Sequence, residues 1–546
     1  MTKNLIKPIW RKLSLLPVIA LLVSCGGGDS SLMANLTGQV TSLTNSTSSK
    51  ATHFAASRFL EQAAMGPSPI NVAQVKAMGI EGWIAAQIKL PPTLVKTDVS
   101  LYDYELNLDK PTEQKMRDHL RLSNANLLIG AEDQLRVRTS WVLSNFLVIS
   151  DSKPLPYGVL EYQNMLQTYA LGQYGDLLKA LTRNPAMGVF LDNGQNRRTQ
   201  LNENYGRELM QLFSVGLVQL NLNGTVKRDV NGKLLETYSQ KDVIEITRAL
   251  TGWNSAEPNG KRKSGNGPNY GKPMEADFPD QHDTGSKTFL GKTIPAGQDA
   301  YKDLDSLVEI LVTHPNAAPF VSLRLIQGMT TSDPSPAYLE RVATVFRDTK
   351  GNLSKVITSI LTDPEARYGD AVAKATSNFG RIKEPLLIFT SGFRGLGCKI
   401  APRENWDPTQ VVQSNTQRQF SAKSVFNFYP PNHRTQGSNV LAPEQKMLNS
   451  TEFSDRMSSF NYRLQDENLL RDAGCEVTLF QTAQAVSDEK LLDLMNERFF
   501  RGSLPASAVK TLIDAHKNYY NRNKGLSLVG SILDMASLMP AYGVSK

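Results

Sequence analysis

Cysteine is scarce in this chain, with three residues among 546, at positions 25, 398 and 475. No CxxC or CxxCH pattern occurs, so thioredoxin-like redox chemistry, zinc ribbons and covalent c-type haem attachment have no sequence support. Cys398 and Cys475 could pair in an oxidising compartment, but the sequence does not show whether their Cα atoms come close enough.

The standard short catalytic signatures are also missing. The chain has no HExxH, GxSxG or GxxxxGK[ST] sequence and no GxGxxG that follows a strand pattern. Zincin, α/β-hydrolase, P-loop and Rossmann chemistry are therefore unsupported. No fixed-period repeat is visible, which argues against a solenoid or a propeller.

Basic residues are not concentrated in the way that nucleic-acid binding requires. The formal net charge is +8, and residues 1–24 carry four of the positive charges, which leaves about +4 on the rest. A dedicated nucleic-acid binder would gather Lys and Arg on one face. We therefore expect no nucleic-acid partner.

The N-terminus has the pattern of a bacterial lipoprotein signal. Four basic residues precede a short apolar run, Leu13 to Val23, that is too short for a stable membrane helix. Leu22-Val23-Ser24-Cys25 resembles a lipobox, which predicts cleavage after residue 24 and lipidation of Cys25. Gly26 after the cysteine resembles the pattern of lipoproteins sorted to the outer membrane of Gram-negative bacteria. The periplasmic face and the cell-surface face of that membrane both stay open. An ordinary secretory signal and an uncleaved anchor are the alternatives.

Three segments follow from composition. Residues 1–24 are the signal peptide, and residues 25–50, rich in Ser, Thr and Gly, predict a flexible tether. Residues 51–546 predict one large, mainly α-helical body in one or two lobes, with long loops and at most small β-hairpins. Helical apolar patterns are clearest in residues 111–149, 157–181, 202–216, 304–313, 318–330, 338–349, 353–362, 384–395, 491–499, 506–520 and 526–539.

The stretch from 202 to 216 has an unusual density of polar groups for one short helix. Glu203 and Arg207 form an i,i+4 pair with the acid first, and Glu208 stands beside them, against a buried stripe that begins at Tyr205. Asn-Gly occurs twice between residues 218 and 238, which predicts hairpin turns. Ser239 with Asp242 predicts a capping box that opens the next helix.

Several motifs together resemble the bacterial family of unknown function called DUF1800. They are Asn202 to Met210, Tyr238 to Val243, Arg248 to Trp253, His282-Asp283-x-Gly285-x-Lys287 to Gly291, and His314-Pro315-x-x-Ala318-x-Phe320. The resemblance covers roughly residues 53–546 and is weakest over the last eighty. It implies an exported protein, often encoded beside a sulfatase-like exported protein, and it implies no established activity.

The turn around His282 is the candidate metal site. Asp277, Asp280, His282 and Asp283 could bind a divalent cation of the Mn, Zn or Fe type, although their spacing fits no EF-hand loop. The alternative, which we favour, is a structural turn in which His282 and Asp283 bond to the backbone and Gly285 supplies a positive φ.

Seven residues would make a plausible polar pocket if the motifs converge, and a buried structural network explains them equally well. They are Glu203, Arg207, Glu208, Arg248, His282, Asp283 and Lys287. Two functions stay open. One is an envelope-anchored binding or assembly protein for another exported protein or a surface polymer. The other is an envelope hydrolase acting on a polysaccharide or an ester through His282, Asp283 and Glu203, with or without a metal.

Overall fold

The computed structural model describes residues 51–96, 110–154, 156–256, 268–276, 279–371, 379–400, 417, 420–450, 460, 464, 466–519 and 526–546. Lys50–Lys546 forms one compact unit, distinct from Met1–Ser49. The lipobox with Cys25 and the metal candidate Asp277 lie outside the described residues. No helix in the described ranges has the length and apolar character needed to cross a membrane.

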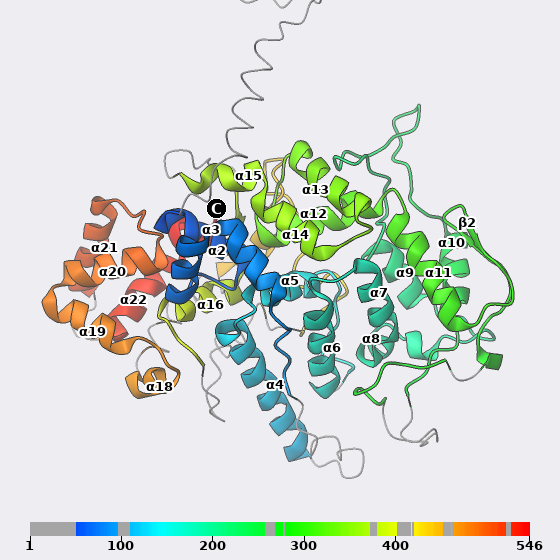
Figure 1. Ribbon diagram of the computed structural model, residues 1–546, viewed down its shortest axis with the longest axis horizontal. Coiled ribbons are helices and arrows are strands. Elements are labelled where there is room, and N and C mark those ends of the chain that lie inside the picture. Colours follow the sequence, from blue (N-terminus) through cyan, green and yellow to red (C-terminus); the bar gives the residue numbers. More distant parts are fainter. Residues whose placement is uncertain are drawn as a thin grey trace, which may run out of the picture. The chain divides into compact units, whose positions relative to one another are not determined.

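The fold is mainly α, as expected from the sequence (Figure 1). One large hydrophobic cluster is built by most of the helices in the first two thirds of the chain. Its helices are α2 (His53–Ala63), α3 (Pro69–Lys89), α5 (Gln134–Ser144), α6 (Pro156–Tyr169), α7 (Tyr174–Arg183), α8 (Pro185–Phe190), α9 (Asn204–Gln211), α10 (Gln240–Ala249), α11 (Ala300–Thr313), α12 (Ala317–Met329), α13 (Pro336–Asp348), α14 (Leu353–Thr362) and α15 (Pro364–Arg367).

A second hydrophobic cluster joins the C-terminal helices, drawn in orange to red in Figure 1, to α4 and α16 from earlier in the chain. Helix α5 belongs to both clusters, because Leu135 and Val142 face the first and Val137 and Trp141 face the second. The helices of the second cluster are α4 (Lys110–Gly130), α16 (Pro385–Gly395), α18 (Glu467–Asp472), α19 (Val477–Val486), α20 (Asp488–Phe499), α21 (Ala506–Tyr519), α22 (Leu526–Ser537) and α23 (Pro540–Gly543).

Strands are few and short in the described residues. Strand β1 (Lys287–Phe289) pairs antiparallel with β2 (Lys292–Ile294), and β3 (Arg381–Ile382) pairs with β4 (Val544–Ser545). The elements described also include the 3₁₀ helices η3 (Asn193–Gln195), η5 (Pro279–Gln281), η6 (Tyr368–Asp370) and η9 (Pro443–Met447).

Helix α9 is shorter than the predicted helix over 202–216. It ends at Gln211, and the chain then closes with wider bonds in which the Val215 and Gly216 N–H groups both donate to the Met210 carbonyl. Gly216 has φ 72°, and a Cβ there would lie 2.6 Å from the Phe320 ring. The apolar periodicity continues past the helix end because the turn is itself buried, so periodicity alone misplaces the boundary.

The two Asn-Gly sequences form tight turns, as predicted. Gly224 and Gly232 have φ near 80°, and their N–H groups donate to Asn221 and Asp229. The segment from 217 to 237 is thereby folded into three short extended stretches that bond to one another. Asn316 fixes the base of this segment, because its amide donates to the Val215 and Val218 carbonyls.

Cys398 and Cys475 are joined by a disulfide within the second cluster. Two backbone hydrogen bonds flank the bridge, from Lys399 N–H to the Ala473 carbonyl and from Glu476 N–H to the Leu396 carbonyl. The sequence left this pairing open because 77 residues separate the two cysteines.

Candidate functional site

Helix α10 contacts strand β1 through a row of charged side chains. The predicted capping box is present: Ser239 accepts from the Asp242 N–H, and Asp242 accepts from the Ser239 N–H. The other carboxylate oxygen of Asp242 accepts from Leu290 N–H, and Glu245, one turn later, accepts from Thr288 N–H. Acidic groups at i and i+3 of the helix therefore satisfy backbone donors along the edge of β1.

Arg248 continues this row and binds Asp283 through two parallel hydrogen bonds, from Nε at 2.8 Å and from Nη2 at 3.1 Å. Its Nη1 donates to both oxygens of Glu245 and to the Ser286 carbonyl. Burial would raise the pKa of Asp283, but the Arg248 bonds and the Gly285 N–H outweigh burial and lower it. The hydrogen bonds that Arg248 donates to Asp283 raise the pKa of Arg248. This is a fork-to-carboxylate pair that keeps both groups ionised.

Gly285 does not have the positive φ that we expected of it. A Cβ at this position would lie 2.7 Å from Nη2 of Arg248 and 3.0 Å from Oδ1 of Asp283. Glycine is required at position 285 because the Arg248–Asp283 pair lies too close to leave room for a Cβ atom, and not because the backbone conformation demands it.

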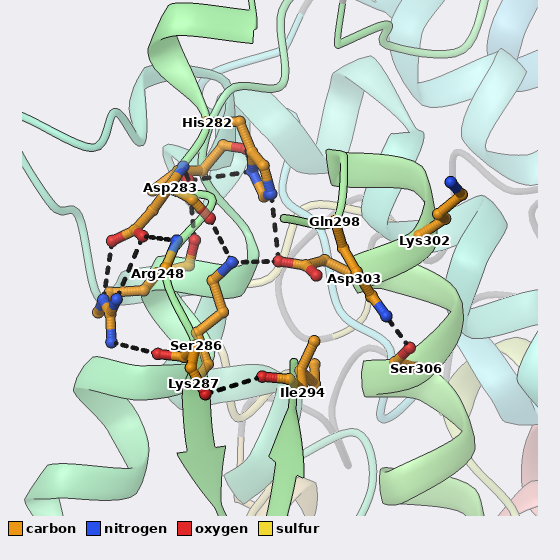
Figure 2. Close-up of polar contacts among 12 residues, drawn as sticks. Arg248, His282, Asp283, Ser286, Lys287, Ile294, Gln298, Lys302, Asp303 and Ser306 are labelled. Atoms are coloured by element: carbon orange, nitrogen blue, oxygen red, sulfur yellow. Dashed lines mark hydrogen bonds and ion pairs between the residues drawn. The ribbon is translucent and has the colours of Figure 1, made fainter. Parts of the chain in front are cut away.

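The centre of the cluster is a buried group of three polar side chains, shown in Figure 2. Lys287 on β1 and Asp303 in the first turn of α11 are both 0% exposed, and Nζ of Lys287 donates to Oδ2 of Asp303 and to the Asp283 carbonyl. Nε2 of His282 lies 3.1 Å from the same Oδ2. The turn at His282, strand β1 and helix α11 are thus joined through one carboxylate oxygen.

His282 is held on both sides of its ring. Nδ1 lies 2.9 Å from the Thr251 carbonyl, while Nε2 faces the Asp303 carboxylate. The Thr251 hydroxyl donates to the Arg248 carbonyl and accepts from the Asp283 N–H, so it offers no proton to the ring. Both ring nitrogens therefore have partners within the chain, and neither is left for a further one.

Glu203, Arg207 and Glu208 form a separate group. Arg207 pairs with Glu203 at 2.8 Å as predicted, and Gln240 bonds to both, on a partly exposed surface. Burial raises the pKa of Glu208, and its Oε2 is buried without a hydrogen-bond partner among the described residues. Within the described part of the chain, no hydrogen bond or ion pair connects these three residues to Arg248, His282, Asp283 or Lys287. The seven candidates therefore divide into four and three.

The described residues contain no group of three or more His, Cys, Asp or Glu side chains placed to hold a metal ion. Asp280 is exposed in the middle of η5, Asp283 is bonded to Arg248, and both ring nitrogens of His282 have partners. His282 and Asp283 do bond to the backbone, at the Thr251 carbonyl and the Gly285 N–H, while the metal site stays a prediction because Asp277 lies outside the described residues.

Sequence reasoning missed Asp303, Glu245 and Thr251, which complete the cluster. Asp303 stands 21 residues after His282 and follows the helix cap Asp299, where an acid is ordinary and carries no signal of a partner. Glu245 is an ordinary helix-surface acid by its pattern. Gly252 offered a better clue, because a glycine at the end of a helix can also mark a close approach of two backbone segments. Its φ is 93°, and a Cβ atom there would lie 3.2 Å from the His282 backbone nitrogen.

Helix α10, the β1–β2 hairpin and the start of α11 therefore define a rigid, internally paired polar junction. Residues 58–542 match the family described as "Protein of unknown function (DUF1800)", and the chain belongs to that family. No curated protein and no solved structure matches this chain.

Proposed function

We propose that this chain is an envelope-anchored lipoprotein that acts as a binding or assembly component for another exported protein or a surface polymer. The proposal rests on the burial and pairing of the motif residues. His282, Lys287 and Asp303 are sealed in the interior and paired with one another, and Arg248 is occupied by Asp283 and Glu245. Such groups stabilise a junction, and the atoms that are paired in it are not free to react with a substrate.

The anchored location has its own support. The Cys398–Cys475 disulfide fits a compartment in which thiols are oxidised, such as the bacterial periplasm or surface. The lipobox ending at Cys25 supplies the anchor, since acyl chains together hold a protein at a membrane stably. Outer-membrane sorting follows from Gly26, and the exported sulfatase-like partner follows from the family resemblance.

The hydrolase acting on a polysaccharide or ester is the second candidate, and one observation favours it. Oδ1 of Asp303 is buried with no hydrogen-bond partner among the described residues, although Oδ2 accepts from both Lys287 and His282. An unsatisfied carboxylate oxygen inside a charged cluster is the kind of feature that marks functional sites.

One experiment separates the two candidates. The full chain is extracted from bacterial envelopes in mild detergent, and its native mass, composition and release of soluble sugar or ester product from isolated envelopes are measured. We expect a defined complex with a second exported protein or a polymer, no product release, and loss of membrane association in Cys25→Ala. A monodisperse single chain that releases product, and stops doing so in His282→Gln without a change in melting temperature, would replace this proposal with the hydrolase.

A further inference from the structure

Two Asn-Gly pairs lie in turns of the same type within the segment from 217 to 237. In each turn the glycine N–H donates to the carbonyl of the residue three positions earlier, which is Asn221 in the first turn and Asp229 in the second. The N–H of that earlier residue donates to the carbonyl of the residue after the glycine. The glycines have φ 81° and 80°, as in a hairpin in which a type I turn is followed by a left-handed residue. The two pairs are Asn223-Gly224 and Asn231-Gly232.

The first pair is held in place by its surroundings. Leu222 packs against the first hydrophobic cluster, and a Cβ on Gly224 would collide with the Leu339 side chain. Oδ1 of Asn223 accepts hydrogen bonds from the N–H and from the hydroxyl of Thr225, at 3.1 Å and 2.7 Å. The side-chain amide carbon of Asn223 therefore cannot turn toward the Gly224 nitrogen until these bonds break.

The second pair lacks these restraints. Val230, just before the pair, is fully exposed, and a Cβ on Gly232 would meet no atom within 4 Å. The carboxamide of Asn231 forms no hydrogen bond with any residue in the described ranges. In this turn the carboxylate of Asp229 bonds to the backbone instead, since its Oδ1 accepts from the Asn231 and Lys233 N–H groups. The Asn231 side chain can therefore rotate toward the Gly232 nitrogen without breaking a bond of its own.

The Gly232 nitrogen itself is restrained by a single turn hydrogen bond, from its N–H to the Asp229 carbonyl at 3.0 Å. Arg228 bonds to the Gly232 carbonyl and not to the nitrogen. Because residues 230–233 are exposed, this turn opens at a lower free-energy cost than the buried parts of the fold. Glycine also leaves its nitrogen unhindered, because it has no Cβ.

We propose that Asn231 is a modification site, at which the folded protein converts asparagine spontaneously into aspartate and isoaspartate, while Asn223 is preserved. When the turn opens, the Gly232 nitrogen loses its proton to hydroxide and attacks Cγ of Asn231. A bond from this nitrogen to Cγ forms, the bond from Cγ to Nδ2 breaks, and Nδ2 takes a proton from water and leaves as ammonia. Water then adds to either carbonyl of the cyclic imide and opens it, which gives aspartate or isoaspartate. No group is oxidised or reduced, and water is the only co-reactant.

Conversion would change the surface of this turn. It adds a negative charge close to Asp229, and isoaspartate also adds a CH₂ group to the main chain. The inference is independent of the envelope function proposed above.

The test follows amide-to-acid conversion in the full chain, kept in mild detergent at mildly alkaline pH. Samples are digested under mildly acidic conditions, where the reaction is slow, and chromatography with mass spectrometry measures aspartyl and isoaspartyl peptides at each site. The matched control sites are Asn223 and Asn193, which also precedes a glycine and whose buried carboxamide donates to the Thr182 carbonyl. The same chain in concentrated urea gives the rates without the folded structure. Asn231→Gln removes the proposed site and identifies its peptides.

In the folded chain we expect Asn231 to convert at least about tenfold faster than Asn223 or Asn193, because the other two must first give up hydrogen bonds and packing. In urea we expect similar rates at the three sites, since each is followed by glycine. A ratio below about tenfold in the folded chain, or a preference for Asn231 that is as large in urea, would overturn the proposal.

Discussion

Replacing Asp303 by Asn should be among the most damaging single changes in this protein. The substitution keeps the shape of the side chain and removes the negative charge that Lys287 and His282 share. Lys287 is 0% exposed, so its ammonium group would be left in the interior without a counter-charge. Breaking a buried pair in this way costs about 3–5 kcal/mol. That is a large part of the roughly 5–15 kcal/mol by which a domain is stable.

The assay is urea unfolding of the full chain followed by circular dichroism at pH 7. Asp305→Asn is the matched control, because Asp305 lies on the same helix and pairs with Lys179 at 2.6 Å across an exposed surface. Exposed pairs contribute less than about 1 kcal/mol. We expect a large fall in the unfolding free energy for Asp303→Asn and little change for Asp305→Asn.

A double variant tests the cause of the loss. Asp303→Leu with Lys287→Met removes both charges, so no ammonium group is left unpaired, and much of the lost stability should return. Equal, small effects for Asp303→Asn and Asp305→Asn would refute the reasoning. So would a double variant that is no more stable than Asp303→Asn.

Three further predictions follow from individual groups. Because hydrogen bonds from Arg248 lower the pKa of Asp283 in the folded state, Asp283→Asn should be less stable than the wild type at pH 7. The difference should shrink as the pH falls below about 4, through the folded pKa, and parallel urea-unfolding curves across pH would contradict it. Because burial raises the pKa of Glu208, Glu208→Gln should raise the melting temperature at pH 7, and this gain should fade toward about pH 4. A lower melting temperature of the variant at pH 7 would show that the carboxylate is needed. The disulfide closes a loop across 77 residues. The double variant Cys398→Ser with Cys475→Ser should therefore lose at most about 4 kcal/mol of unfolding free energy. A reductant should lower the unfolding free energy of the wild type to that of the variant and leave the variant unchanged.

Local features of this fold were predictable because they depend on residues close together in the chain. The capping box of Ser239 and Asp242, the Glu203–Arg207 pair and the two Asn-Gly turns are all present. Each involves groups within four residues, for which spacing fixes geometry. The mainly α class followed from periodicity in the same way.

The assembly of the polar junction could not be predicted from the sequence. Asp303 contacts His282 and Lys287 only because α11 packs beside β2 and α10, and an acid in the first turn of a helix is too common to indicate such a role. Gly285 shows the same limit. The sequence suggested that this glycine supplies a turn conformation, whereas the structure shows that a side chain here would occupy the space that Arg248 needs.

The densest polar motifs of this protein stabilise its own framework. Around α10, Arg248 and Lys287 donate to carboxylates and carbonyls of the chain itself, and both ring nitrogens of His282 face such groups. A ligand gains most where donors are already in place and unsatisfied, because no internal bond must first be broken. The motif residues around α10 thus account for the framework, and a ligand that bound to them would first have to break these internal bonds.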